Sequence, residues 1–217
     1  MNVSRGVYLV LLLITLFCYL GSSGGKKFYT KMVVALMILW LFTAVSAIIL
    51  VRIFKVQNNL ILFHISTPIE YVIIASMYHS LISNKLLKKI ISLSLPGFIL
   101  VSIFLSTFIQ GVKENNSYAI ILESIILIFL SLFFLREILV LQPVVKIYKY
   151  PAFWITVGIL AYFTGNFLIE GMLNFMVSQS LELARRTYLV GYIFKYILFI
   201  VFIIGKILSV DFKKRIN

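Results

Sequence analysis

The chain has 217 residues, of which 62% are hydrophobic and only 12% are charged, and its formal net charge is +13. Soluble domains are about 45–50% apolar and about 25% charged, so this composition excludes an ordinary soluble protein and predicts an integral membrane protein. The positive charge does not indicate nucleic-acid binding, because that function needs a soluble basic domain or arm and the sequence contains none.

Charged residues divide the apolar sequence into seven stretches. The predicted membrane spans cover residues 6–21, 32–51, 59–82, 90–112, 117–135, 151–177 and 188–208. Each is close to the ~20 residues that a helix needs to cross ~30 Å of hydrocarbon. The connections are short, with no room for a soluble domain. We therefore expect an all-α membrane protein in which residues 1–217 form a single seven-helix transmembrane domain.

The distribution of lysine and arginine between alternate connections predicts the orientation in the membrane. One set of connections holds thirteen of them, namely Lys26, Lys27, Lys31, Lys85, Lys88, Lys89, Arg136, Lys146, Lys149, Lys206, Lys213, Lys214 and Arg215. The other set holds six, namely Arg5, Arg52, Lys55, Lys113, Arg185 and Arg186. Because the richer side is usually cytoplasmic, we expect the N-terminus outside the cell and the C-terminus in the cytoplasm.

The first span has an alternative interpretation as a cleaved signal peptide. Arg5 precedes its apolar core and small residues follow it, as in such peptides. Cleavage would leave six spans and would reverse every later connection, which would place the basic set outside. The residues before Cys18 lack the small side chains expected at a lipidation site.

Four charged residues interrupt the apolar spans: Glu70, Glu123, Glu170 and Lys195. An ionisable group at that depth costs about 2.5–3.5 kcal/mol on insertion scales, so such residues face the bundle interior and meet a partner. In the expected topology all four lie between the membrane midplane and the external face. The inner half of the bundle has few polar residues to match them.

Helical periodicity predicts how these residues assemble. Tyr162, Asn166 and Glu170 are spaced by four and share one face of the sixth span, and Tyr192 and Lys195 share a face of the seventh. We expect an outward-facing polar pocket formed by the third, fifth, sixth and seventh helices, with Lys195 at its electrostatic centre facing the carboxylates. The candidate ligand-binding residues are Glu70, Asn166, Glu170, Lys195, Tyr162, Tyr192, Glu123 and His64.

A purely structural role for this set is the main alternative. Lys195 would then pair with Glu70 or Glu170 and hold helices together, and Glu123 would reach the interface from its shallow depth. We predict no catalytic, metal-binding or cofactor-binding residue, because the two histidines are far apart and Cys18 is the single cysteine.

Three segments carry a resemblance to known proteins: NLILFHISTPIE at 59–70, FWITVGILAYFTGN at 153–166 and KYILF at 195–199. Together they resemble uncharacterised seven-helix bacterial integral membrane proteins whose genes often lie beside sensor histidine kinase genes. The resemblance implies a sensory or signalling accessory of the bacterial cytoplasmic (inner) membrane, with a histidine kinase as a possible partner. It carries no established chemistry.

Two other functions remain open at this point. A membrane-embedded lipid-processing enzyme would use buried carboxylates as acid and base, although no paired-aspartate motif occurs. A small-solute transporter would use carboxylates near the midplane to carry protons or ions. A retinal protein would place an aspartate one turn before the last-helix lysine, where this chain has Gly191. The oligomeric state and the ligand have no signal in the sequence.

Overall fold

The structure is a computed structural model that describes residues 3–21, 27–56, 58–141, 147 and 150–214. The described residues form seven α-helices and one short π-helix. In chain order these are α1 (Val3–Leu20), α2 (Phe28–Arg52), α3 (Ile61–Leu81), α4 (Lys85–Phe104), η1 (Leu105–Ile109), α5 (Ser117–Leu141), α6 (Pro151–Gln179) and α7 (Leu181–Lys214). The π-helix η1 continues α4 directly. All seven predicted spans are therefore confirmed as helices.

Within the described residues, seven helices are long and apolar enough to cross a membrane. The stretch Lys85–Ile109, which joins α4 and η1, counts as one of them. These helices are those of an integral membrane protein, in which the backbone must satisfy its own hydrogen bonds inside the lipid.

Several helices extend beyond the predicted apolar spans, because charged side chains near a helix end can reach the interface without ending the helix. Helix α4 begins at Lys85, where the Asn84 side chain accepts a hydrogen bond from the Leu87 N–H at 3.0 Å. Helix α7 begins at Leu181 rather than at 188. The fourth predicted span was too long at its other end, since η1 stops at Ile109 and Gly111 makes the following turn with φ of +71°.

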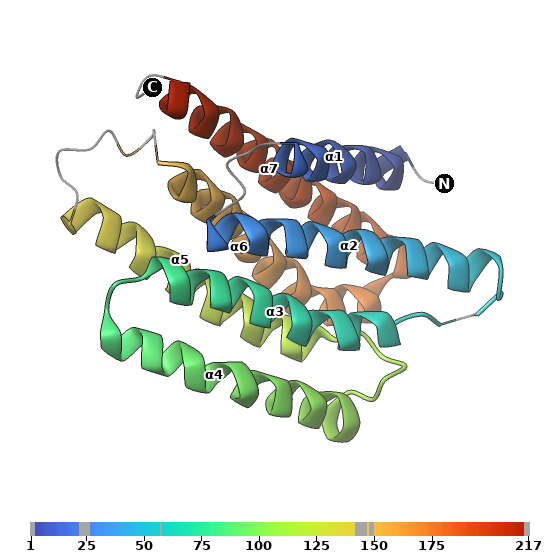
Figure 1. The fold of residues 1–217 in the computed structure, drawn as a ribbon. Helices are drawn as coiled ribbons and strands as arrows, with labels where there is room; N and C mark the ends of the chain where they lie inside the picture. The colour runs from blue at the N-terminus through green and yellow to red at the C-terminus, as the bar shows by residue number, and fades with distance from the viewer. Residues whose placement is uncertain (1–2, 22–26, 57, 142–146, 148–149, 215–217) are drawn as a thin grey trace.

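Six of the seven long helices form a closed ring. The neighbours around it are α1, α2, α3, α5, α6 and α7, and α7 packs back against α1. Helix α4 lies outside this ring and packs mainly on α3 (Figure 1). The interior of the ring is therefore shared by helices that are distant in sequence.

The two ends of the bundle differ. The N-terminus and the α2–α3 and α4–α5 connections lie at one end, and the C-terminus with the α3–α4 connection lies at the other (Figure 1). We call them the N-terminal end and the C-terminal end. Toward the C-terminal end the ring is filled by fully buried apolar side chains, among them Leu36, Met37, Ile74, Met77, Phe199 and Phe202.

The most extensive helix contact in the ring is between α6 and α7. A Cβ atom added to Gly165 would lie only 2.3 Å from the Phe194 ring, so the absence of a side chain at Gly165 is what lets the two helices approach. Small residues have this role in many membrane helix interfaces. The contact fixes the relative position of the α6 and α7 faces that reach the interior of the ring.

Candidate ligand-binding cavity

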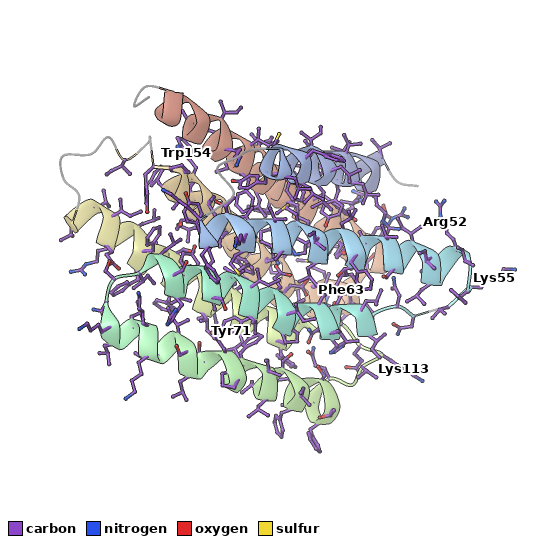
Figure 2. The ribbon with its side chains drawn as sticks, viewed as in Figure 1. Arg52, Lys55, Phe63, Tyr71, Lys113 and Trp154 are labelled. Atoms are coloured by element: carbon purple, nitrogen blue, oxygen red, sulfur yellow. The ribbon has the colours of Figure 1, made fainter. Side chains whose placement is uncertain are left out.

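A cavity of about 310 Å³ occupies the half of the ring nearer the N-terminal end. All six ring helices line it, and α4 contributes no residue. Phe63, one of its lining residues, is labelled toward that end in Figure 2, where the cationic residues Arg52, Lys55 and Lys113 also project. A concave site with converging polar groups inside an apolar scaffold is the usual form of a small-molecule site.

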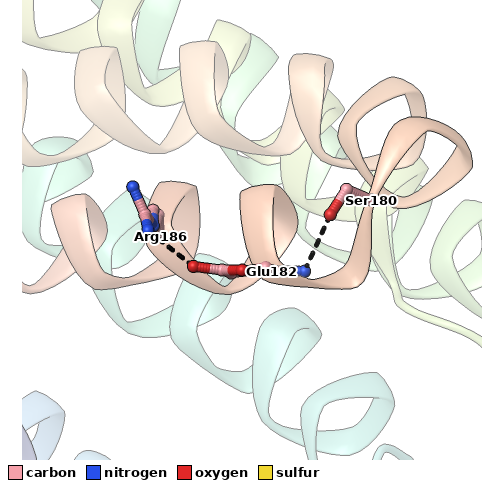
Figure 3. Close-up of polar contacts among 3 residues, drawn as sticks. All are labelled: Ser180, Glu182 and Arg186. Atoms are coloured by element: carbon pink, nitrogen blue, oxygen red, sulfur yellow. Dashed lines mark hydrogen bonds and ion pairs between the residues drawn. The ribbon is translucent and has the colours of Figure 1, made fainter.

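The turn between α6 and α7 lies at the same end of the bundle as the cavity. The Glu182 N–H donates to the Ser180 hydroxyl at 3.2 Å, and Glu182 forms an ion pair with Arg186 one turn further along α7 (Figure 3). The hydrogen bond to Ser180 satisfies one of the N–H groups that a helix start leaves free. This local capping explains why α7 starts before its apolar stretch and brings Tyr188 to the cavity.

Three carboxylates from three different helices line the cavity: Glu70 from α3, Glu123 from α5 and Glu170 from α6. All three side chains are buried. The Trp40 side chain lies beside Glu70, and the Asn115 side-chain amide donates to Glu170 Oε2 at 2.7 Å. Among the described residues, Glu70 Oε1 and Glu123 Oε1 have no hydrogen-bond partner although both atoms are buried.

Lys195 enters the cavity from α7 and lies against aromatic rings. Its Nζ atom is 5.4 Å from the centroid of the Tyr8 ring and 5.8 Å from that of Tyr192. In the described part of the chain its ammonium forms no ion pair with Glu70 or Glu170. The expected direct lysine–carboxylate pair is therefore replaced by a cation–π arrangement, which is favourable where water is scarce.

The polar face predicted for α6 reaches the cavity as a unit. Tyr162, Asn166 and Glu170 all line it. Tyr192 and Lys195 from α7 line it as well. The period-four spacing on α6 correctly placed these residues together.

His64 is the candidate residue that does not line the cavity. Its Nδ1 atom is 2.7 Å from Ser106 Oγ in η1, and its Nε2 atom is 3.0 Å from the Glu114 carbonyl oxygen. Beside it, Asn116 donates to Thr67 at 3.1 Å. These bonds tie α3 to η1 and to the α4–α5 connection, so His64 holds α4 onto the ring from the side that faces away from the cavity.

Two helices, α1 and α2, were missing from the sequence-based description of the pocket. The pocket was assigned to the third, fifth, sixth and seventh helices, but α1 contributes Arg5 and Tyr8, and α2 contributes Trp40. Asn115, which precedes α5, also lines the cavity. Tyr8 and Trp40 carry no signal in the sequence, because an aromatic residue in an apolar span serves lipid contact equally well.

No group of three or more His, Cys, Asp or Glu side chains placed to hold a metal ion occurs among the described residues. The chemistry available in the cavity is that of carboxylates, one ammonium group, one guanidinium group, amides, hydroxyls and aromatic faces. Such a set can bind and orient a small polar solute.

No protein family, curated protein or solved structure matches this chain in the three comparisons with known proteins.

Proposed function

We propose that the chain is a sensory accessory of the bacterial cytoplasmic membrane that binds a small solute in an outward-facing cavity and acts on a sensor histidine kinase. The observation that carries this proposal is the asymmetry of the ring. One half holds a cavity lined by four charged side chains from within the spans, and the other half is closed by a packed core of mainly apolar side chains.

This asymmetry favours binding over passage. A transport pathway needs polar groups or an opening on both sides of the membrane, and substrate sites of transporters lie between two accessible faces. Here the described side chains beyond Trp40, Glu70 and Lys195 form a tightly packed core that includes Ile74 and Phe202. A cavity in one half and a packed core in the other is an arrangement that suits a receptor.

The distribution of basic residues supports the orientation. In the sequence, the predicted connections on the side of the cavity hold six lysine and arginine residues, and the alternate set of connections holds thirteen. The positive-inside rule then places the cavity on the external side. The same rule presents the basic connections to the cytoplasm, where they are available to a partner protein.

The proposal predicts that water-soluble reagents enter the cavity from outside the cell. Ala47 lies on α2 among the lining residues, whereas Ala75 on α3 is fully buried in the apolar core. In a Cys18→Ser background, we expect Ala47→Cys to react with a membrane-impermeant thiol reagent added to intact cells, and Ala75→Cys to remain unreacted. Reaction of Ala47→Cys only in inside-out vesicles would refute the orientation.

The signalling role is tested separately. Co-purification of the tagged chain with a membrane histidine kinase, and altered output of that kinase after deletion of the gene, are the expected results. Unchanged output of every kinase in the deletion strain under varied envelope stress would refute this role and leave the cavity itself unaffected.

A further inference from the structure

We propose that the cavity selects small organic cations, such as primary or quaternary amines, over neutral and anionic solutes. This inference rests on the proposed function, since it names the class of ligand that the outward-facing cavity would bind. It is argued from the unpartnered carboxylate oxygens, from the aromatic lining and from the position of the one lysine.

The unpartnered oxygens identify where a donor is missing. Glu70 is 9% exposed and Glu123 is 2% exposed, and within the described residues each has one buried oxygen without a hydrogen-bond partner. A buried acceptor left unpaired is costly, and most buried polar groups in proteins are paired. Both side chains line the same cavity from α3 and α5, so one ligand carrying N–H or positively charged groups would lie beside both carboxyl groups.

The aromatic lining has the composition of a cation site. The rings come from five helices and belong to Tyr8, Trp40, Phe63, Tyr162, Tyr188 and Tyr192. The faces of tyrosine and tryptophan attract ammonium groups, and aromatic cages are a common way to bind quaternary amines. The ring faces attract a bound cation, and the carboxylates attract it through their charge. Neither feature stabilises a bound anion.

Lys195 shows that the cavity already accommodates an ammonium group. Its Nζ atom lies over Tyr8 and Tyr192 instead of in an ion pair with a described carboxylate. Three buried carboxylates face this one lysine, and Arg5 at the mouth is exposed to solvent. The cavity therefore holds more carboxyl groups than basic groups, and a bound cation would favour the ionised form of these carboxyls.

The experiment compares three thiol reagents of similar size and different charge on Ala47→Cys in the Cys18→Ser background. They carry a trimethylammonium, a hydroxyl or a sulfonate group on the same ethyl methanethiosulfonate frame. Each rate is divided by the rate of the same reagent with free 2-mercaptoethanol, which removes the intrinsic reactivity. We expect the normalised rate of the cationic reagent to exceed that of the anionic one by about tenfold or more, as electrostatic focusing in a cleft allows.

Substitutions then identify which carboxylate causes the preference for the cationic reagent. Glu123→Gln and, as a second variant, Glu70→Gln should each reduce the cationic preference several-fold while the neutral reagent reacts as before. Glu137→Gln is the matched control, because Glu137 is on α5 with Glu123 but accepts a hydrogen bond from the Ser83 N–H at 2.6 Å outside the cavity. It should leave the preference unchanged.

The outcomes separate the two proposals. Equal normalised rates for the three reagents, or a preference for the anionic one, would overturn the selectivity for cations while the accessible cavity stands. Absence of reaction with all three reagents would overturn the accessible cavity itself. Tetramethylammonium should in addition protect Ala47→Cys from the neutral reagent, and an equal concentration of the neutral tert-butanol should not.

Discussion

Lys195 on α7 and Tyr8 on α1 meet where the ring closes, with the lysine nitrogen 5.4 Å from the centroid of the tyrosine ring. This contact joins the first and the last helix of the chain beside the cavity. It also shields a charge from the hydrocarbon without the direct carboxylate pair that its position in the sequence suggested.

A double-mutant cycle on this pair should reveal coupling. Tyr8→Leu removes the ring and Lys195→Met removes the charge, while both retain apolar bulk. We expect a coupling free energy of about 0.5–2 kcal/mol, the range of cation–π contacts from exposed to desolvated sites. Unfolding of the purified protein by a denaturing detergent measures it. The cycle of Lys195→Met with Tyr29→Leu, whose ring lies on α2 away from the cavity, should give no coupling.

The close approach of α6 and α7 predicts a size limit at Gly165. Gly165→Ala would place a Cβ atom 2.3 Å from the Phe194 ring, so the helices or the ring must move. We expect a loss of about 1–3 kcal/mol of stability, as for other overpacked positions. Gly171→Ala on the same helix is the control, because nothing lies within 4 Å of its added Cβ. Equal melting temperatures for the two variants would contradict the close contact.

The tie between His64 and η1 predicts a selective effect on the α4 side of the bundle. Ser106→Ala removes the partner of His64 Nδ1, so a buried ring nitrogen loses its hydrogen bond. This should cost about 1–3 kcal/mol and increase amide hydrogen exchange over η1 and the α4–α5 connection.

Thr107→Ala provides the comparison for Ser106→Ala. Thr107 belongs to the same π-helix, is exposed, and bonds only to carbonyls of its own turn, at Ile103 and Phe104. Its removal should leave exchange in the α4–α5 connection nearly unchanged. A larger effect for Thr107→Ala than for Ser106→Ala would rule out the tethering role of His64.

The proposed orientation predicts the behaviour of reporter fusions. A green fluorescent protein fused at the C-terminus should fluoresce, because that reporter folds in the cytoplasm. Alkaline phosphatase fused in the α2–α3 connection, after Val56, should be active, because that enzyme requires the external side. The opposite pattern for both reporters would support the signal-peptide interpretation of residues 6–21, which reverses every later connection.

The number and approximate positions of the helices followed from the sequence alone. Hydrophobicity and span length are local properties, and about 20 apolar residues are sufficient to define a membrane helix. The shared face of Tyr162, Asn166 and Glu170 was also predictable, because it depends only on the 3.6-residue period of one helix. Seven of the eight candidate residues therefore line the cavity, with His64 the exception.

The tertiary structure decided which faces meet. Because the ring closes through α1 and α7, Tyr8 lies against Lys195. Because α4 lies outside the ring, His64 forms a hydrogen bond with Ser106 and does not line the cavity. These pairings depend on how closely helices approach, as at Gly165, and no local pattern encodes that distance. Aromatic residues such as Trp40 are equally stable against lipid and inside the bundle, so only packing could assign them to the cavity.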